Sequence, residues 1–158
     1  MKKVKLDDLK GSFLFKDMAE DEISTLAGIF SEKRMDEGMT VFIENMPGES
    51  LYLVQRGAIK ISKMLAEGEE KTLVILGPED VFGEMAILDG APRSATARVA
   101  ETAQLLSIKK DDFEKLCDSN PKLGLKLMRN IIRVFSQRIR ENNEDYREML
   151  LWSLGKKG

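Results

Sequence analysis

The most informative segment of the chain is Val81-Phe82-Gly83-Glu84-Met85-Ala86-Ile87-Leu88-Asp89-Gly90-Ala91-Pro92-Arg93-Ser94-Ala95-Thr96-Ala97. Its first residues are typical of a strand that ends at Gly83, where a glycine lets the backbone approach a ligand closely. Residues 84–88 predict a short helical turn whose first N–H groups lack partners, and such a helix end attracts an anion. Residues 89–92 fold the chain back, so Arg93 and Ser94 enter the next strand beside that helix end.

These groups suit a phosphate. A guanidinium such as that of Arg93 can hold a phosphate through two parallel N–H donors, and the Ser94 hydroxyl can donate a further hydrogen bond. The Glu84 carboxylate would repel a phosphate unless it accepts a hydrogen bond, for instance from a ribose hydroxyl. We therefore predict a small phosphorylated ligand of the nucleotide type. The simpler alternative is a surface turn in which Arg93 pairs with Glu84 and Ser94 is hydrated.

The composition excludes several kinds of enzyme. The chain has 158 residues, 42% of them apolar and 33% charged, which indicates one soluble globular domain with or without an appendage. It has no histidine, which excludes Ser/His/Asp and Cys/His catalysis, most zinc or iron sites and a jelly-roll metalloenzyme. Cys117 is the only cysteine, so no disulfide within the chain and no thiolate metal cluster can form. We expect no enzymatic activity, no metal and no cofactor.

Charge and hydropathy limit the partners. The 25 lysines and arginines are balanced by 27 acidic residues, and the net charge of −2 argues against a protein that binds nucleic acid with its whole surface. No apolar run approaches the roughly 18 residues of a transmembrane helix. The charged N-terminus, residues 1–8, lacks the apolar segment of a signal peptide. We expect a cytoplasmic protein without a membrane partner.

The pattern of apolar residues divides the chain into three parts. Residues 1–31 are predicted to be helical, with apolar side chains at three-to-four spacing from Ile23 to Phe30. Residues 32–109 contain short apolar or alternating runs separated by glycine, proline and aspartate, which is typical of an antiparallel sandwich or barrel. An exposed hairpin tip is predicted at 66–70. The predicted strands are 40–43, 51–54, 58–62, 72–76, 95–99 and 104–108.

Residues 110–158 are predicted to form a short helix through Cys117 and a long helix that begins at Asn120-Pro121 and reaches about Trp152. The long helix carries mostly apolar residues at alternating spacings of four and three, the pattern of a coiled-coil seam. The seam residues are Met128, Ile132, Phe135, Ile139, Asn142, Tyr146, Met149 and Ser153. This pattern predicts a homodimer formed through the helix, with Asn142 favouring one register. The alternative is an amphipathic helix that packs only on its own domain.

The segments 82–86 and 90–96 resemble the phosphate-binding cassette of the cyclic nucleotide-binding domain family. That family includes bacterial catabolite activators, regulatory subunits of protein kinases and cyclic-nucleotide-gated channels. Further segments resemble its paired-glycine strand (47–59), the approach to the cassette (77–84), and the exit strand and lid hinge (105–121). The resemblance covers roughly residues 10–140. It implies an α+β fold, in which an antiparallel β-roll (jelly roll) is flanked by N-terminal helices and a long C-terminal lid and dimerisation helix.

The resemblance also implies roles for individual residues. Glu84 would accept a hydrogen bond from the ribose 2′-hydroxyl, and Arg93 would pair with the cyclic phosphate. Gly83 would permit the close approach of the backbone, and Ser94 would donate to the phosphate or to the base. Backbone N–H groups would help to hold the phosphate, and they lie near Gly83, Met85, Ala86 and Ala95.

The base end of the predicted site is less specific. By position relative to the family pattern, Leu73 and Val74 form an apolar wall under the purine. The long helix provides the lid, where Arg133 and Arg138 either stack on the base as cations or stay in solvent. The chain lacks the Thr-Ser pair that catabolite activators have in this region. The choice between cAMP and cGMP therefore stays open, although the cassette most resembles bacterial cAMP-binding examples.

Three functions remain. The main hypothesis is a regulatory module that binds cAMP, or cGMP, and acts by movement of its C-terminal helix on an effector protein that the sequence does not name. The second is a fragment of a DNA-binding transcription factor of the catabolite-activator type. Only six residues follow Trp152, too few for a helix-turn-helix, so nucleic-acid binding is not expected for the chain as written. The third is a dimerisation module with an idle pocket.

Overall fold

The computed structural model of the protein describes residues 2–155. Its N-terminal part contains the helices α1 (Leu6–Leu9) and α2 (Glu20–Ala27) and a 3-10 turn, η1 (Phe13–Phe15). The expectation of a helical segment holds for these elements. It fails at the two ends of the segment, where the strand β1 (Lys2–Lys3) pairs with the start of β2 (Ser31–Met35).

The remaining strands form one antiparallel sheet with β1 and β2, as the sequence predicted. They are β3 (Thr40–Phe42), β4 (Ser50–Met64), β5 (Glu70–Leu76), β6 (Val81–Phe82) and β7 (Thr96–Lys109). The order along the sheet is β1-β2-β7-β4-β5, while β3 pairs with β7 and β6 pairs with β4. A short 3-10 turn, η2 (Ala66–Gly68), closes the predicted hairpin between β4 and β5. The α+β class is confirmed.

Two of these strands are longer than predicted. The sequence indicated separate strands on either side of Gly57, and again within 95–108, whereas β4 and β7 each run through as a single strand. The register between them shifts between Val54 and Ile59, so a bulge bends the strands without ending them. Gly57 has a φ of +83°, and a Cβ there would lie 2.3 Å from the carbonyl oxygen of Thr102. The glycine therefore marks a bulge between two paired strands and not a turn.

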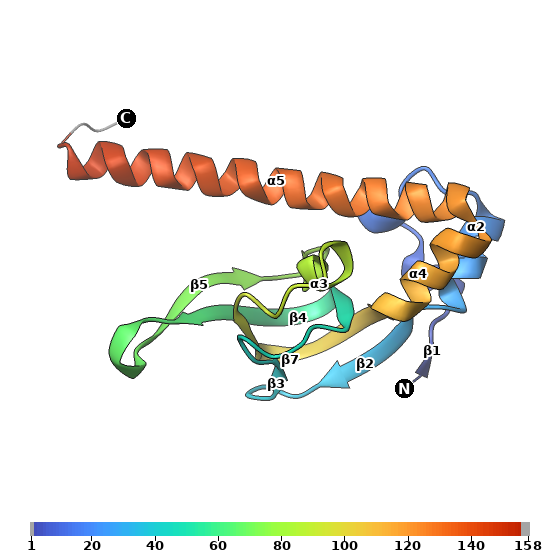
Figure 1. The fold of residues 1–158 in the computed structure, drawn as a ribbon, viewed down its shortest axis with the longest axis horizontal. Helices are drawn as coiled ribbons and strands as arrows, with labels where there is room; N and C mark the ends of the chain where they lie inside the picture. Colours follow the sequence, from blue (N-terminus) through green and yellow to red (C-terminus); the bar gives the residue numbers. More distant parts are fainter. Residues whose placement is uncertain (1, 156–158) are drawn as a thin grey trace.

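Three further helices complete the fold. They are α3 (Glu84–Leu88), α4 (Lys110–Ser119) and α5 (Pro121–Ser153). The long helix begins where predicted, because the Asn120 side chain accepts a hydrogen bond from the N–H of Leu123 and Pro121 occupies the first turn. It extends over α3 and past the β4–β5 hairpin (Figure 1). Within residues 2–155 no helix has the length and hydropathy needed to span a bilayer.

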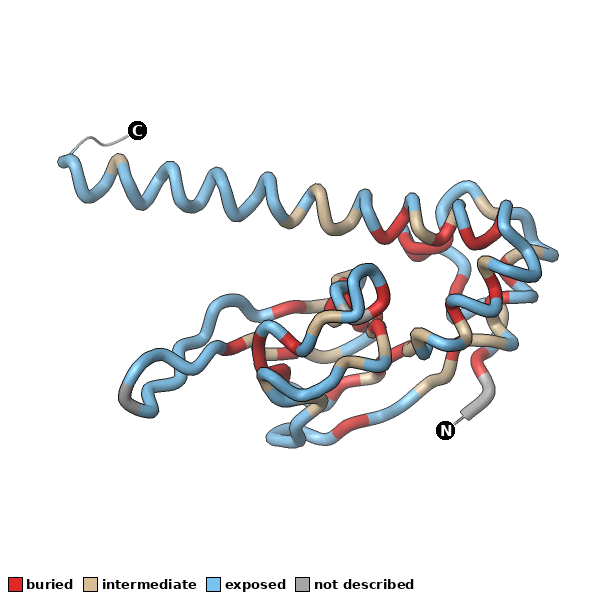
Figure 2. Tube along the Cα trace, viewed as in Figure 1, coloured by how far each residue is buried: buried red, intermediate tan, exposed pale blue. Residues whose placement is uncertain are grey.

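Two hydrophobic clusters hold the fold together. One lies between the sheet and the helices and includes Leu51, Leu106, Leu26 and the α5 residues Leu123 and Leu127. The other lies within the rolled sheet and includes the side chains of Val54, Ile59, Val99 and Leu105. Buried residues are concentrated in the sheet and in the first part of α5, while the second part of α5 is mostly exposed (Figure 2). The sheet and the first part of α5 therefore form the rigid frame of the molecule.

Candidate functional site

A cavity of about 380 Å³ lies between β5, the segment that contains α3, and α5. Its volume falls within the range of small-molecule sites, which is about 300–1,000 Å³. The structure brings nine of the eleven predicted site residues to its walls: Leu73, Val74, Gly83, Glu84, Met85, Arg93, Ser94, Ala95 and Arg138. Residues far apart in the sequence thus share one hollow.

Gly83 connects β6 to α3 in a conformation that suits only glycine. Its φ is +76°, in the left-handed region. A Cβ at this position would lie 2.6 Å from Nη1 of Arg93 and 3.0 Å from the carbonyl oxygen of Ser50. The turn lets α3 begin at Glu84, so the first N–H groups of α3, which include those of Met85 and Ala86, have no partner within the helix.

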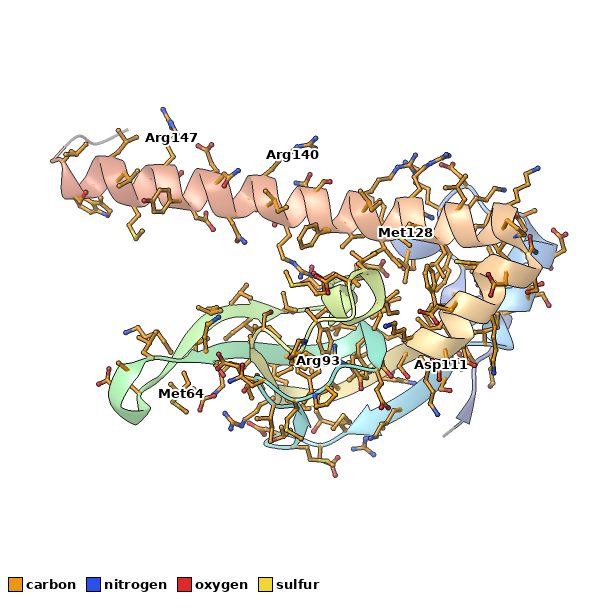
Figure 3. All side chains as sticks on the ribbon, viewed as in Figure 1. Met64, Arg93, Asp111, Met128, Arg140 and Arg147 are labelled. Carbon is orange, nitrogen blue, oxygen red and sulfur yellow. The ribbon has the colours of Figure 1, made fainter. Side chains whose placement is uncertain are left out.

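The Arg93 side chain is held rigidly beneath α3, where Figure 3 labels it. It is only 6% exposed. Nη1 donates to the carbonyl oxygen of Gly83 at 3.1 Å, and Nη2 donates to that of Ser50 at 2.8 Å. The guanidinium carbon lies 4.0 Å from the centre of the Phe42 ring, which stacks on it as a cation–π partner. These contacts orient the group before any ligand arrives.

Arg93 is a buried cation that lacks a counter-ion. Among residues 2–155 it takes part in no salt bridge, and its Nε is buried without a hydrogen-bond partner. Burial lowers the pKa of the guanidinium, while Tyr52 and Glu84 act in the opposite direction. A guanidinium nevertheless stays charged at neutral pH. Because a buried, uncompensated charge is costly, this end of the cavity favours an anion.

Glu84 pairs with α5 and not with Arg93. Its side chain is almost fully buried, and Oε1 accepts a hydrogen bond from Nη1 of Arg138 at 3.1 Å. Nη2 of Arg138 also donates to the carbonyl oxygen of Val81. One arginine of α5 is therefore bound to the segment that forms the floor of the cavity.

The remaining cassette residues and the apolar wall are less enclosed. The Ser94 hydroxyl is exposed and donates to Sδ of Met85 at 3.8 Å, and Ala95 is buried. Leu73 and Val74 are 57% and 39% exposed on β5, although they line the cavity. An apolar ring placed there would cover them and remove that surface from water.

Arg133 is not brought to this cavity. Its Nη1 lies 3.4 Å from a carboxylate oxygen of Asp17 and 3.2 Å from Oδ1 of Asn130. It lines a second hollow of about 640 Å³ between η1, β5 and α5. Ala86 lies in α3, but its side chain is outside the part of the chain that the structure describes.

Sequence reasoning did not assign several residues that line the cavity. They include Phe42, Ile61, Phe82, Phe135, Ile139 and Asn142. Phe42 had no signal, because nothing near it in the chain indicates that its ring would stack on Arg93. Phe135, Ile139 and Asn142 did have a signal, since all three belong to the predicted seam, but that pattern indicated only a helix partner.

The family assignment follows from a match over residues 32–120, more than half of the chain, to the cyclic nucleotide-binding domain family. The chain belongs to this family. The resemblance seen in the cassette is thereby confirmed.

Individual members show how widely this domain is used. The chain is 32% identical over 133 residues to the "Cyclic AMP receptor protein" of Thermus thermophilus, a match that covers 84% of this chain and 60% of that protein. It is 34% identical, with a TM-score of 0.62, to the regulatory domain of Toxoplasma gondii PKA in co-crystals with cAMP, covering 70% of this chain and 42% of that one. A cyclic nucleotide-binding domain from Methylobacillus flagellatus has the same fold, with a TM-score of 0.80 at 24% identity, covering 89% and 79% of the two chains. The chain spans about 60% of the length of the curated relatives it matches.

Proposed function

We propose that this domain binds a cyclic nucleoside monophosphate, cAMP in preference to cGMP, and acts as a cytoplasmic regulatory module without catalytic activity of its own. The observation that carries the proposal is the buried guanidinium of Arg93, which lines the cavity without a counter-ion and with its Nε unpaired. A phosphate monoanion would neutralise that charge. The relatives named above include a cyclic AMP receptor protein and a domain crystallised with cAMP, which supports cAMP as the ligand.

The arrangement of the walls supports one orientation of the ligand. The cyclic phosphate is proposed to lie against Arg93, the first N–H groups of α3 and the Ser94 hydroxyl. The ribose 2′-hydroxyl donates to Glu84. The purine then lies toward the apolar wall of Leu73 and Val74, under α5.

The output is proposed to be a change in how α5 sits on the domain. Glu84 already accepts from Arg138 of α5, so a ribose hydroxyl that donates to the same carboxylate would act directly on this contact. A ligand shifts such an equilibrium only by the difference between its affinities for the two arrangements. The sequence does not identify the effector protein that would respond to this change.

A second copy of the chain is the proposed partner of α5. Four seam residues expose apolar side chains at heptad spacing, and these are Ile132 (49% exposed), Ile139 (43%), Tyr146 (58%) and Met149 (58%). Pairing two such helices would bury this surface in a homodimer.

Isothermal titration of the wild-type protein with cAMP, cGMP and 5′-AMP tests the proposal. We expect both cyclic nucleotides to bind and Arg93→Ala to lose affinity by at least about tenfold, because a charge-assisted hydrogen bond contributes about 1.5–3 kcal/mol. Arg93→Lys should not restore binding, since an ammonium lacks the planar pair of donors. Arg34→Ala, which removes an exposed arginine on β2, is the matched control. A folded wild-type protein that gives neither heat nor a thermal shift at millimolar nucleotide would refute the proposal.

A further inference from the structure

The guanidinium of Arg93 is in contact with an aromatic ring and not with an acid. Its central carbon lies 4.0 Å from the centre of the Phe42 ring, while the Glu84 carboxylate pairs with Arg138. An aromatic face attracts a cation, and it does so more strongly where water is excluded. Because the ring has no net charge, it stabilises the guanidinium without neutralising it, and the charge stays available to an anion.

The Phe42 ring is itself held in place by two other rings. Phe42 is the last residue of β3, and the centre of its ring lies 5.8 Å from that of Phe82 on β6 and 6.1 Å from that of Tyr52 on β4. The rings of Tyr52 and Phe82 stack on each other with their centres 5.1 Å apart. Since the three rings come from three strands, the surface that meets the guanidinium is part of the sheet.

The segment that follows β3 also holds the backbone of Arg93. The N–H of Asn45 donates to the carbonyl oxygen of Arg93 at 2.8 Å, and the N–H of Arg93 donates to the carbonyl oxygen of Met46 at 2.9 Å. Residues 42–46 therefore contact both the backbone and the side chain of this arginine. Backbone carbonyl oxygens occupy two N–H donors of the guanidinium, while Nε has no partner.

We propose that Phe42 is a positioning residue, whose ring holds the Arg93 guanidinium where it receives the phosphate and thereby sets the affinity of the site for a cyclic nucleotide. This inference rests on the proposed function and deepens it by assigning a residue that acts through Arg93. Without the ring, the guanidinium is free to turn toward Glu84, an acid that already attracts it. An ion pair between Arg93 and Glu84 would occupy both the cation proposed for the phosphate and the carboxylate proposed for the ribose.

Two other roles of Phe42 have to be separated from this one. The side chain is half-buried against the hydrophobic cluster of the rolled sheet, so one alternative is packing alone. It also lines the cavity, so the other alternative is direct contact with the nucleotide. Packing depends on the shape of the ring, whereas the positioning of a cation depends on the negative charge of the ring face. A direct contact leaves Arg93 equally ordered in the free protein with and without the ring.

The first measurement is the affinity for cAMP and cGMP by isothermal titration, together with the thermal stability of each protein. The proteins are the wild type, Phe42→Leu, a protein with pentafluorophenylalanine in place of Phe42, and a matched control with pentafluorophenylalanine in place of Phe30, a buried ring of the other hydrophobic cluster. Fluorination keeps the ring but reverses the charge of its face. Both changes at Phe42 should weaken the binding of both nucleotides by about threefold to tenfold, within the range of one cation–π contact, while the control at Phe30 stays within about twofold of the wild type.

The second measurement is the order of the Arg93 side chain in the free protein. The relaxation of the Arg93 Nε–H signal in nuclear magnetic resonance, assigned by its loss in Arg93→Ala, reports how rigid the guanidinium is. We expect a rigid group in the wild type and in the Phe30 control, and a mobile group in both Phe42 proteins. Because this measurement needs no nucleotide, it separates positioning from direct contact with the ligand.

If the fluorinated ring at position 42 leaves the affinity and the Arg93 signal as they are in the wild type, Phe42 acts in packing alone and the inference is wrong. If the affinity falls while Arg93 stays rigid, the ring contacts the nucleotide directly and the inference is again wrong. In both cases the proposed function stands. A wild-type protein that binds neither nucleotide refutes the proposed function, and this inference with it.

Discussion

The two halves of α5 have different surroundings. In the first half the buried residues are Leu123, Gly124, Leu127, Asn130 and Ile131, and none of the α5 residues from Ile132 to Ser153 is buried. Polar contacts add to this packing, since Lys126 pairs with Glu22 of α2 and the Asn130 amide donates to the carbonyl oxygens of Leu14 and Lys16. The first half is therefore part of the core.

The second half crosses the cavity and continues beyond it (Figures 1 and 2). Its apolar residues Ile139, Tyr146 and Met149 are exposed, and its strongest tie to the sheet side is the ion pair of Arg138 with Glu84. Leu127 and Ile131, which are buried in the first half, do not belong to the predicted heptad seam, and the seam residue Ile132 is 49% exposed. The difference teaches that the face of α5 that packs on its own domain and the face that carries the heptad pattern are separate. The proposed ligand would therefore act on the half of α5 that the domain supports least.

The largest expected effect concerns how much each half of α5 contributes to the stability of the fold. Leu127 is fully buried in the first half, so Leu127→Ala should lower the free energy of unfolding by about 2–5 kcal/mol. Tyr146 is 58% exposed in the second half, and Tyr146→Ala should change that free energy by less than about 0.5 kcal/mol at concentrations where the chain is monomeric. Urea denaturation measures both values. Equal losses would contradict the division of the helix into a supported and an unsupported half.

The second prediction concerns the polar anchor of the first half. Asn130 is 2% exposed, and Asn130→Ala leaves the carbonyl oxygens of Leu14 and Lys16 without their donor. We expect the free energy of unfolding, measured by urea denaturation, to fall by about 1–3 kcal/mol. Hydrogen exchange in η1 should become faster. Asn143→Ala removes an exposed asparagine from the second half and should leave both measurements unchanged.

The third prediction tests the ion pair that ties the second half to the cavity. Arg138→Ala should lower the free energy of unfolding by about 1–3 kcal/mol, because the almost fully buried Glu84 carboxylate loses its hydrogen-bond donor. Hydrogen exchange should become faster in α5 after Arg138 and stay unchanged before Ile131. Arg140→Ala is the control, since Figure 3 shows the Arg140 side chain directed away from the sheet. Faster exchange along the whole helix would mean that the two halves move as one body.

The smallest expected effect is a pH dependence of stability that comes from Glu22, the partner of Lys126 in the first half of α5. The N–H of Ala19, and next the ammonium of Lys126, lower the pKa of Glu22 from its usual value of 4.5. A lowered carboxyl pKa stabilises the fold above the unfolded-state pKa, and this stability is lost as the pH falls through the folded-state pKa. Glu22→Gln should therefore be less stable than the wild type by up to about 1 kcal/mol at pH 7.

The difference between Glu22→Gln and the wild type should shrink as the pH is lowered below the usual value of 4.5, and urea denaturation at a series of pH values measures it. Glu144→Gln, which changes an exposed acid of the second half that pairs with Arg147, is the control. A difference that persists unchanged at low pH would show that the charge of Glu22 contributes nothing.

Much of the fold was predictable because it depends on neighbours in the chain. The long helix follows from Asn120-Pro121 and the spacing of its apolar residues, and the structure places it from Pro121 to Ser153. The strands were predicted, but their continuity was not, because the bulge at Gly57 lies directly against the backbone of Thr102 on another strand, which the local sequence does not show. A glycine in the sequence is compatible with both a turn and a bulge, so the local sequence does not distinguish the two.

The cassette was predictable for the same reason, since Gly83, Glu84, Arg93 and Ser94 lie within one short segment whose turns bring them together. The absence of histidine and the single cysteine likewise limited the chemistry without any structure. The partners of these residues came only from the tertiary structure. Phe42 stacks on Arg93, Arg138 binds Glu84, and Asn142 lines the cavity, because packing and not sequence spacing determines which distant side chains meet.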